Sequence, residues 1–394
     1  MIKILGVKVN EFSAQEVRER IDIFLRSNRP RFVATLNPEI VLAAQKDEEY
    51  FYILNQTDLS LIDGVGLKFV ARLLGKRIPR LTGADLSLEI LQTASERGLR
   101  VLIINHCNGL SCDREIQVAL KDKYPNLKLC VKSVQLDSMR MPNLGKEEKE
   151  FDIMFVATGA PHQEKFIYHN LHNVLGLRLA IGVGGSFDFV SGKATRAPKI
   201  MRQLGMEWLW RLVKYPKKRA GRIYNAVVKF SLAFLKSRLV NPWFYRDNIA
   251  CLAYKKEADD YYVLIVERED DNDHWQLPQG GTDDENLAVA AFRELSEETG
   301  NSNYKISATF PNLYKYKFGK KNKKHVSYKG QRQGLALAEF VGKDKDIKLN
   351  YWDHCDWQWV RSDKLLNSVH PLRRASTKIF LEKFNEYISK HKIK

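Results

Sequence analysis

The first half of the chain alternates short apolar runs with segments in which apolar residues recur every three or four positions. The runs predict buried strands: RFVATLN, LRVLIIN, LKLCVKSV, FDIMFVATG and LRLAIGVGG. Residues 38–56 (PEIVLAAQKDEEYFYILNQ) and 84–98 (ADLSLEILQTASERG) have helical spacing. Because strands and helices alternate up to about Phe189, we predict an α/β domain with a mostly parallel sheet and helices on both faces.

A basic segment with a helical pattern follows this domain. It covers residues 194–239 and ends before Pro242, which indicates a boundary. From Lys193 to Arg238 there are thirteen Lys or Arg and one acid, Glu207, so twelve of the seventeen net positive charges fall within 46 residues. Such a concentration of charge predicts an anionic partner.

Beyond this boundary the pattern becomes rich in β-strands. Four segments predict strands around a single strong helix: IACLAYKK, YYVLIVERE, QGLALAEFVG and WQWV. The polar, lysine-rich residues 315–330 predict a solvated hairpin tip. We therefore predict an α+β domain over residues 243–394.

The overall composition restricts the class of protein. A length of 394 residues favours two domains, and 44% apolar residues are typical of a globular chain. The five cysteines form no CxxC pair, which favours reduced thiols in a cytoplasm. The first residues lack the apolar core of a signal peptide, and no uncharged apolar run is long enough to span a bilayer. We expect a cytoplasmic protein.

The strong helix of the second domain is predicted to begin near Glu285, with Asp283 or Asp284 as its cap, and to end at Gly300. Its apolar arc is expected to consist of Leu287, Ala288, Ala291, Phe292 and Leu295.

Three carboxylates lie near the end of this helix. Glu294 and Glu297 are expected on one flank of the apolar arc, and Glu298 at its margin. Acids near a helix C-terminus oppose the helix dipole, so helix stability does not explain them. Carboxylates this close repel one another unless a cation intervenes, and a hard ion such as Mg²⁺ prefers oxygen ligands. A solvated acidic helix end is the alternative.

The segment GGTDDENLAVAAFRELSEETG resembles the Nudix box, a glycine and a glutamate followed by R-E-x-x-E-E-x-G. The preceding HWQLPQGG and the later GQRQGLALAEF resemble Nudix hydrolases of dinucleoside polyphosphates and RNA 5′ ends. There are two departures: four residues instead of five separate Gly280 from Glu285, and Asn301 replaces an aliphatic residue.

The Nudix resemblance implies a mechanism. Glu294, Glu297 and Glu298 would hold Mg²⁺ on a diphosphate, with Glu297 and Glu298 as catalytic residues. The residues with a structural or orienting role would be Gly280, Gly281, Glu285 and Arg293. The substrate would be a nucleoside diphosphate derivative. Trp275, Tyr314 and Tyr316 are candidates for stacking on a base, although packing in the core is the simpler interpretation.

Polar clusters in the first domain follow predicted strand ends or begin helices, where open parallel sheets bind ligands. They are TLNPE from Thr35, DGVG from Asp63, TGAD from Thr82, GAPHQE from Gly159 and GVGGSFD from Gly182. Glycines in the last cluster let backbone N–H groups approach phosphate. The chain lacks the GxGxxG pattern of a simple NAD enzyme.

Together these clusters resemble the WecG/TagA/CpsF glycosyltransferases. The motifs occur in the family's order: TLNPE, DGVG, R-x-TGADL, TGAPHQEKFI, IGVGGSFDFVSGKATRAP and LGMEWLWRL. The resemblance covers nearly all of residues 1–222 and implies a Rossmann-like domain. It also implies transfer of an N-acetylmannosamine-type sugar from a UDP-sugar donor to a lipid-diphosphate-linked amino sugar. Such transfer belongs to the synthesis of cell-surface polysaccharides, including teichoic acid. The segment INHCNGLSC departs from the family pattern.

The same resemblance implies roles for particular residues. Asp63 matches the position of the proposed catalytic base, although an aspartate in a turn is the structural alternative. Thr35, Asn37 and Gln163 match polar active-site positions and would bind sugar hydroxyls or the acetamido group. Arg80 would pair with phosphate oxygens, with a surface arginine as the alternative, and Gly184 and Gly185 would bind substrate in the glycine cluster. No DxD motif is present in this half, so no cofactor is expected for the transfer reaction.

The basic segment mixes aromatic and aliphatic residues with cations, as an interfacial amphipathic helix does. In related transferases the corresponding tail docks on membranes and closes over the diphosphate, which implies binding roles for Arg211, Arg219 and Arg222. A core helix with a solvated basic face is the alternative. Nucleic acid is not an expected partner, because no nucleic-acid-binding motif accompanies the charge.

We therefore predict a transferase domain over residues 1–192, a basic helical appendage over 193–240 and a Nudix hydrolase domain over 243–394. The protein would be bifunctional and peripheral at the inner face of the cell membrane. Two alternatives concern the second domain, which would sense a nucleotide without cleaving it or would act on dinucleoside polyphosphates or RNA 5′ ends.

Overall fold

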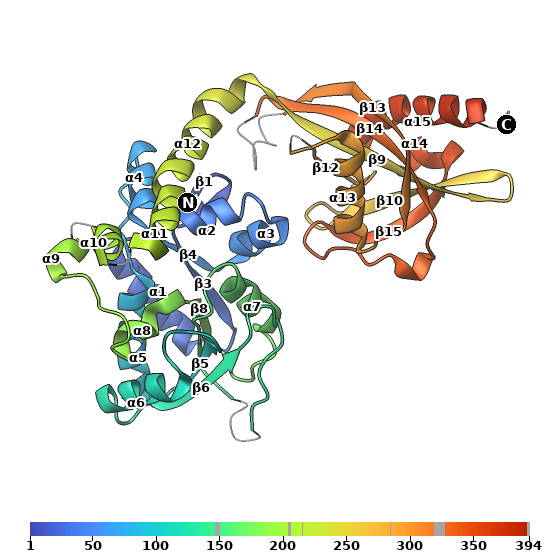
Figure 1. Cartoon of the computed structure of the whole chain (residues 1–394). Helices are drawn as coiled ribbons and strands as arrows, with labels where there is room; N and C mark the ends of the chain where they lie inside the picture. Colours follow the sequence, from blue (N-terminus) through green and yellow to red (C-terminus); the bar gives the residue numbers. More distant parts are fainter. Residues whose placement is uncertain (146–149, 204–205, 215, 284, 319–327, 392–394) are drawn as a thin grey trace. The chain divides into compact units, whose positions relative to one another are not determined.

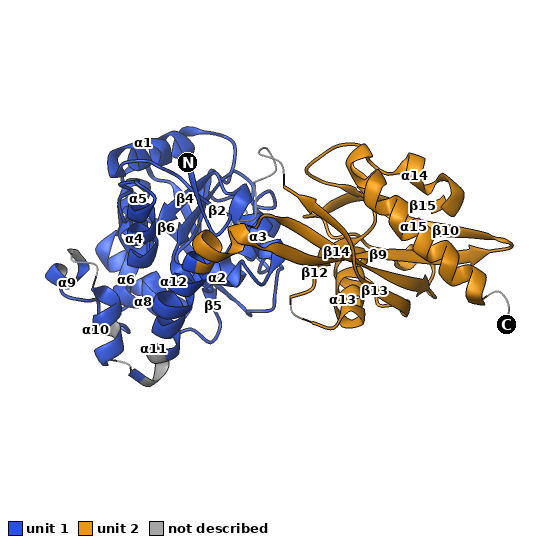
Figure 2. Cartoon of the chain, turned by 90° about the horizontal axis from the view of Figure 1, so that it is seen from above, with its two compact units in different colours: residues 1–235 blue, residues 236–394 orange. Residues whose placement is uncertain are grey.

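The fold is described from a computed structural model, which describes residues 1–145, 150–203, 206–214, 216–283, 285–318 and 328–391. The chain divides into two compact units, Met1–Leu235 and Lys236–Lys394 (Figure 2). Each unit has its own sheet and its own buried core. The two units are described separately below.

Unit 1 is built on a parallel sheet, as the alternating pattern predicts. In the described residues this sheet has six strands in the order β4-β3-β8-β7-β5-β6 (Figure 1). The strands are β3 (Arg31–Leu36), β4 (Leu59–Ile62), β5 (Arg100–His106), β6 (Lys128–Val134), β7 (Ile153–Val156) and β8 (Leu179–Gly182). A separate antiparallel hairpin pairs β1 (Ile2–Ile4) with β2 (Val7–Val9). Because all six strands are parallel, the loops after them meet at one edge of the sheet.

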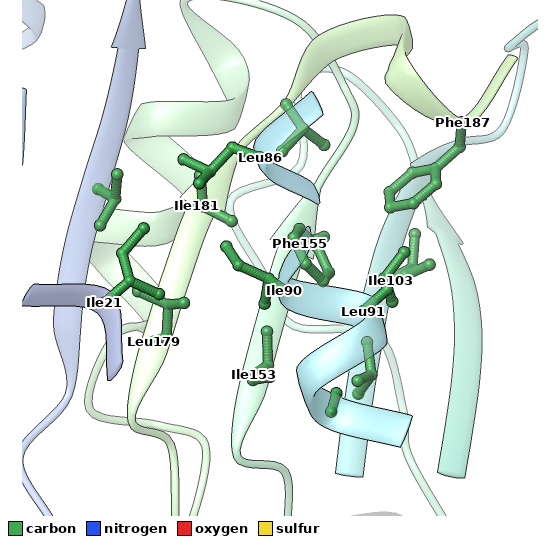
Figure 3. Close-up of a cluster of buried hydrophobic side chains, with 14 of the residues drawn as sticks. Ile21, Leu86, Ile90, Leu91, Ile103, Ile153, Phe155, Leu179, Ile181 and Phe187 are labelled. Atoms are coloured by element: carbon green, nitrogen blue, oxygen red, sulfur yellow. The ribbon is translucent and has the colours of Figure 1, made fainter. Parts of the chain in front are cut away.

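Helices cover both faces of this sheet, because successive strand residues point to opposite sides. On β5, Ile103 belongs to a buried cluster with side chains of α1 (Ala14–Arg26), α5 (Gly83–Arg97) and α6 (Asp113–Lys123). Figure 3 shows part of this cluster, in which Leu86 and Ile90 of α5 lie against strand side chains. Leu102 and Ile104 face the opposite side, together with α7 (His162–Asn170). On that side α2 (Pro38–Ala43), α3 (Glu48–Gln56) and α4 (Val65–Leu73) bury a further cluster.

The single helix predicted over residues 38–56 is wrong, because α2 and α3 are separate helices. Helix α2 ends at its C-cap Ala44. The Asp47 side chain then accepts a hydrogen bond from the backbone N–H of Tyr50 and caps α3. An aspartate that caps a new helix interrupts what the apolar spacing alone presents as one continuous helix.

The basic segment is helical but divided into short pieces. After η2 (Gly184–Ser186) and α8 (Phe187–Val190) come α9 (Lys199–Gln203), α10 (Glu207–Lys214), α11 (Pro216–Ile223), the π-helix η3 (Tyr224–Lys229) and α12 (Phe230–Leu235). Phe230 and Phe234 are 1% and 6% exposed and pack into the cluster around α2 and α4. Helix α12 of the segment is therefore anchored in the core of unit 1.

Unit 2 is an α+β unit with a mixed sheet. It begins with η4 (Lys236–Val240) and η5 (Asn241–Trp243). The central strands run β11-β10-β9-β14-β13, while β12 pairs with β9 and β15 with β10. Their bounds are β9 (Tyr245–Glu257), β10 (Asp260–Arg268), β11 (Trp275–Gln276), β12 (Gln279–Gly281), β13 (Tyr304–Lys317), β14 (Gly330–Phe340) and β15 (His354–Arg361). The pair β9–β14 is parallel and the other pairs are antiparallel. The predicted hairpin tip joins β13 to β14, and its residues 319–327 lie outside the described part.

The predicted strong helix is α13 (Leu287–Thr299). Its N-cap is Asn286, whose side chain accepts the N–H of Ala288, so the prediction that Asp283 or Asp284 caps it is wrong; Asp284 itself is outside the described residues. Gly300 ends the helix at φ 63°, and a Cβ there would overlap the backbone oxygen of Lys348.

Helix α13 is not the single strong helix of this unit, because the chain ends in the longer α15 (Pro371–His391), after η7 (Asp344–Asp346), η8 (Ser362–Lys364) and α14 (Leu365–Ser368). Phe380 and Phe384 of α15 are buried in the core. The buried face of α13 also differs from the predicted arc, since Phe292 is 39% exposed while Glu294 is buried.

Candidate active sites

The loops after β3 and β4 bring the first candidate residues together. Thr35, 4% exposed, donates its hydroxyl to the backbone oxygen of Gly182 at 2.9 Å, which connects the end of β3 to β8. Asn37 caps α2 by accepting the N–H of Ile40 at 3.0 Å. The N–H of Asp63 donates to the oxygen of Leu36 at 2.8 Å. Asp63 and Asn37 therefore lie on adjacent loops at one edge of the sheet.

Arg80 is held beside Asp63. Its Nε donates to the backbone oxygen of Asp63 at 2.5 Å, and its Nη2 lies 3.9 Å from the Asp63 carboxylate. The same Nη2 donates to Glu207 at 3.2 Å. The side chains of Arg80 and Glu207 are only 15% and 9% exposed, so Glu207 holds the guanidinium in place. The sequence did not single out Glu207 for this role, because α10 is far from Asp63 along the chain.

Two further arginines gather at the N-terminus of α5. Arg196 donates to Asp85 at 2.5 Å, and Arg202 Nη1 lies 3.8 Å from the same carboxylate. Burial alone would raise the pKa of Asp85, yet its hydrogen bond with Thr82 and the nearby arginines lower that pKa overall. The backbone oxygen of Arg202 also accepts Arg80 Nη1 at 3.3 Å. Three guanidinium groups therefore lie along this edge, where an anion would be stabilised.

Gln163 belongs to a buried hydrogen-bond chain. The residue is 3% exposed, its Oε1 accepts the N–H of Gly184 at 2.8 Å, and its Nε2 donates to Glu164 at 2.6 Å. Tyr50 donates its hydroxyl to the other oxygen of Glu164 at 2.9 Å. A Cβ at Gly182 would lie 2.7 Å from Gln163 Nε2, so a glycine is needed there. The amide of Gln163 therefore holds the glycine loop, and its role in binding substrate stays a prediction.

The glycine loop itself is tightly built. Gly184 has φ +52°, which favours glycine, and a Cβ at Gly185 would lie 2.9 Å from the Asp188 carboxylate. Asp188 in turn accepts the hydroxyl of Ser111 at 2.7 Å. Gln163 therefore holds the loop by a hydrogen bond, and the Asp188 carboxylate lies close against Gly185.

Glu164 is fully buried, and burial raises its pKa to about 7. In the unfolded chain its pKa is near the ordinary value of about 4.3. The folded state therefore binds more protons between these two values, and its stability falls as the pH rises through that window. A shift of this size corresponds to a loss on the order of 3 kcal/mol by pH 8.

We expect Glu164→Gln to remove most of this pH dependence. The glutamine keeps the shape and can still accept from Tyr50 or Gln163, but it has no proton to lose. Thermal unfolding of the full chain at pH 5 and pH 8 measures the effect. The drop in melting temperature of unit 1 between the two pH values should shrink in Glu164→Gln and persist in the exposed control Glu96→Gln. An equal drop in both variants would contradict the role of burial at Glu164.

The appendage contributes one described candidate arginine. Arg222 donates to Glu39 of α2 through three hydrogen bonds of 2.5 to 3.0 Å. The side chains of Arg211 and Arg219 lie outside the described part of the structure. The following residues of the segment expose apolar side chains: Val213, Tyr224, Val227, Leu232, Leu235 and Leu239. Within the described residues, no helix combines the length and the apolarity needed to cross a membrane.

In unit 2, Arg293 is the centre of the acidic cluster. It donates to Glu285 at 2.9 Å, to Glu294 at 2.7 Å, to Glu297 at 3.3 Å and to the backbone oxygen of Gly281 at 2.8 Å. Burial lowers the pKa of Arg293, but its carboxylate partners outweigh burial and raise it. Arg293 is a permanent cation among these acids and reduces their mutual repulsion. The sequence analysis expected a metal ion alone to do this.

Two of the three glutamates are buried. Glu294 and Glu298 are 2% and 3% exposed, while the side chain of Glu297 is 48% exposed and turned toward Arg293. Glu298 Oε1 accepts the N–H of Gln279 at 3.2 Å, and its buried Oε2 has no aligned hydrogen bond. His354 Nε2 lies 3.0 Å from this oxygen but is not aligned to donate a hydrogen bond to it. A buried carboxylate oxygen without an aligned donor suits a hard cation, so these residues fit Mg²⁺.

The three glutamates do not form the tightest group of candidate ligand atoms. Among the described residues, the group whose ligand atoms all lie within 4.8 Å is Asp271, His274 and His370. The rings of His274 and His370 stack in parallel, 9° apart, and Arg373 donates to His274 at 3.4 Å. Imidazole binds metals in the plane of its ring, so two stacked rings beside an arginine are poorly suited to share one ion.

Two residues beside Glu298 were missed by the sequence analysis. His354 Nε2 lies 3.0 Å from Glu298 Oε2 at an ion-pair distance, and both residues are buried. Burial lowers the pKa of His354, but the charge of Glu298 raises it overall. Burial and the charge of Glu298 both raise the pKa of Asp353. No spacing pattern in the sequence connects Asp353 and His354 to Glu298, so only the fold places these two residues beside it.

The aromatic candidates behave mainly as packing residues. Trp275 and Tyr314 pack against the core that includes Phe380. Tyr316 accepts a hydrogen bond from Arg373 at 3.3 Å, and its ring centroid lies 6.0 Å from that of Tyr314.

Gly280 is needed next to the acidic cluster, because a Cβ there would overlap the carboxylate of Glu294. We expect Gly280→Ala to displace Glu294 from Arg293 and to lower hydrolysis by unit 2 by about tenfold or more, while the unit stays folded. Release of phosphate or nucleotide from a nucleotide panel measures this. Gly221→Ala is the control, since a Cβ at Gly221 has nothing within 4 Å. Equal hydrolysis by Gly280→Ala and the wild type would contradict the importance of this contact.

Residues 2–242 match the family model described as "Glycosyl transferase WecG/TagA/CpsF family". The chain belongs to the WecG/TagA/CpsF glycosyltransferase family. Residues 244–383 match the NUDIX domain, so a Nudix domain follows the transferase domain in the same chain.

Curated relatives of the transferase domain carry one printed name, N-acetylglucosaminyldiphosphoundecaprenol N-acetyl-beta-D-mannosaminyltransferase. The Bacillus subtilis protein is 33% identical over 217 residues, which are 54% of this chain and 82% of the relative. The protein of Staphylococcus aureus strain MRSA252 is 31% identical over 245 residues, 60% of this chain and 94% of the relative.

Solved structures resemble the Nudix part. A Caenorhabditis elegans Ap4A hydrolase complex is 20% identical and covers 37% of this chain and 98% of its own, with a TM-score of 0.29. The Escherichia coli dihydroneopterin triphosphate pyrophosphohydrolase is 16% identical and covers 36% of this chain and 99% of its own, with a TM-score of 0.28. At these values the likeness says nothing about the substrate.

Proposed function

We propose that unit 1 transfers an N-acetylmannosamine-type sugar from a UDP-sugar to the hydroxyl of a lipid-diphosphate-linked amino sugar. The observation that supports this best is the position of Asp63 at the carboxyl edge of the sheet, beside Arg80 and on the loop next to Asn37. Membership of the family and the mannosaminyltransferase relatives support the same reaction class.

The residues suggest how the transfer proceeds. Asp63 accepts the proton of the acceptor hydroxyl while the hydroxyl oxygen bonds to the anomeric carbon of the donor sugar. The bond from that carbon to UDP breaks, and UDP leaves with its electrons. Arg80 stabilises the negative charge that develops on the diphosphate, with Arg196 and Arg202 nearby. Gln163 accepts the N–H of Gly184 and so holds the glycine loop, whose lack of side chains would let the donor phosphates approach its backbone.

The test of this proposal is a transfer assay. The full chain is given UDP-N-acetylmannosamine and a soluble lipid-diphosphate N-acetylglucosamine analogue, and released UDP and disaccharide are measured together. One UDP per disaccharide supports the proposal, and disaccharide formation without UDP release contradicts it.

We propose that the Nudix domain hydrolyses a nucleoside diphosphate derivative. Glu294, Glu297 and Glu298 would hold Mg²⁺, which would neutralise the phosphoryl oxygens and make a water nucleophilic. Arg293 fixes Glu285 and Glu294, and Glu298 presents a buried oxygen at the site. A panel of nucleotides with and without Mg²⁺ identifies the substrate and tests the proposal.

A second candidate for this domain is nucleotide sensing without cleavage, or action on dinucleoside polyphosphates or RNA 5′ ends. Sensing is favoured by the shortened spacing between Gly280 and Glu285 and by the engagement of Glu297 with Arg293 at 3.3 Å. Tight nucleotide binding with no product would decide for sensing.

We further propose that the chain works at the inner face of the cell membrane, in the cytoplasm. The exposed apolar side chains of the appendage and its basic residues fit an anionic membrane surface. Arg222 contributes less to that contact than the sequence implies, because Glu39 already pairs with it.

A further inference from the structure

A basic surface feature lies on unit 1, apart from Asp63 and its neighbours. A surface pocket of about 530 Å³ lies between α4 and the start of α1. Its lining consists of Ser13, Ala14, Lys68, Arg72, Lys76, Arg77, Ile78 and Pro79. Four of these eight residues are cationic and none is acidic. Neither the proposed transfer nor the proposed hydrolysis uses this pocket.

Most of the positive charge of the pocket is not neutralised by the protein. Lys76 pairs with Glu11 at 2.7 Å. In the described part of the chain, no ion pair connects a carboxylate to Lys68, Arg72 or Arg77. Ser13 and Glu16 cap the start of α1 with their own hydrogen bonds, so the nearest acid of α1 is already engaged. Three exposed cations around one hollow attract a multiply charged anion.

The helix that carries these cations also exposes apolar side chains. Phe69 and Leu73 of α4 are 61% and 59% exposed. Lys68 and Arg72 are four residues apart on α4, and so are Phe69 and Leu73. Each pair therefore forms a stripe along the helix, and the apolar stripe lies next to the cationic one. A cationic stripe beside an exposed aromatic and aliphatic stripe is typical of a surface that rests on an anionic bilayer. A free phosphate would explain the cations but not the apolar stripe.

The position of the pocket relates it to the candidate transferase site. Its wall ends at Ile78 and Pro79, and the next residue, Arg80, donates to the backbone of Asp63 at 2.5 Å. An occupant of the pocket therefore lies along the same short segment as Arg80. A lipid surface there would suit an acceptor whose diphosphate carries a lipid.

We propose that Lys68, Arg72, Lys76 and Arg77 bind the phosphate headgroup of an anionic phospholipid, while Phe69 and Leu73 enter the interface of the bilayer. This membrane contact is separate from the appendage. It does not depend on either proposed reaction, because it rests on the pocket, its charges and the apolar stripe alone.

The test compares vesicle binding by the full chain and its variants. Sedimentation is measured with vesicles of phosphatidylcholine alone and with added phosphatidylglycerol. Lys68→Glu/Arg72→Glu should weaken binding to the phosphatidylglycerol vesicles by at least about tenfold. The control Arg114→Glu/Lys123→Glu makes the same change of charge on exposed positions of α6 and should change binding by less than about threefold. Equal weakening by the two double variants would overturn the proposal.

Two further measurements separate the sources of phosphate. Phe69→Ser/Leu73→Ser should weaken vesicle binding but leave binding of inorganic phosphate, measured by calorimetry, unchanged. If Lys68→Glu/Arg72→Glu loses inorganic phosphate but keeps vesicle binding, the pocket holds a free anion and the lipid proposal is wrong. UDP release with a soluble acceptor should be unchanged in these variants, so failure of this proposal differs from failure of the transfer proposal.

Discussion

Asp63→Asn is expected to lower acceptor-dependent UDP release by about 10²- to 10⁴-fold, the usual contribution of a general base. Asparagine has nearly the shape of aspartate but does not accept the proton of the acceptor hydroxyl. The contact between Arg80 Nε and residue 63 uses the backbone oxygen, so the substitution leaves it in place. The loss should therefore appear in kcat, with little change in the affinity for UDP.

Two comparisons make this result specific. Asp122→Asn changes an exposed aspartate near the end of α6, away from the loops that follow the strands, and should transfer sugar like the wild type. UDP binding by Asp63→Asn, measured by calorimetry, should stay within about threefold of the wild type. If Asp63→Asn releases UDP at the normal rate, the proposed base is wrong, and the loop after β4 has another role.

Glu298→Gln is expected to have the second large effect, a loss of Nudix hydrolysis by about 10²-fold or more. The substitution replaces a buried anionic ligand with a neutral amide, which holds a divalent cation poorly. Binding of Mg²⁺ without substrate, measured by calorimetry, should weaken in parallel. UDP release by the transferase domain should be unchanged, because Glu298 belongs to unit 2.

The matched control for this prediction is Glu382→Gln, an exposed glutamate on α15. It should hydrolyse nucleotides and bind Mg²⁺ like the wild type. Full hydrolysis by Glu298→Gln would remove Glu298 from the proposed mechanism. Tight nucleotide binding by the wild type without any Mg²⁺-dependent product would favour the sensing alternative.

Strands that are buried on both faces were predictable from the sequence, because they form continuous apolar runs. The run around Ile103 became β5, and the run around Phe155 became β7. The short β4, LSLI, was expected only as a strand end before Asp63, because Ser60 interrupts its apolar run. Helix α15 was missed for a different reason. Its apolar residues are spread around the helix, so it has little amphipathic pattern although Phe380 and Phe384 are buried.

The candidate sites were predictable only where the motif residues are close along the chain. The sequence indicated Asp63, Arg80 and the three glutamates of the box. It did not indicate that Glu207 would hold Arg80, because α10 reaches it only through the fold. The burial of Glu294 and Glu298 was also underestimated, since helical spacing describes one helix and not the strand β12 packed against it.

The central claim is that the carboxyl edge of the six described parallel strands is a glycosyltransferase site. Its most direct test is UDP release by the intact chain, measured with the UDP-sugar donor in the presence and absence of the lipid-diphosphate acceptor. We predict UDP release that requires the acceptor and equals the disaccharide formed. No release, or release that is the same without the acceptor, would contradict the claim.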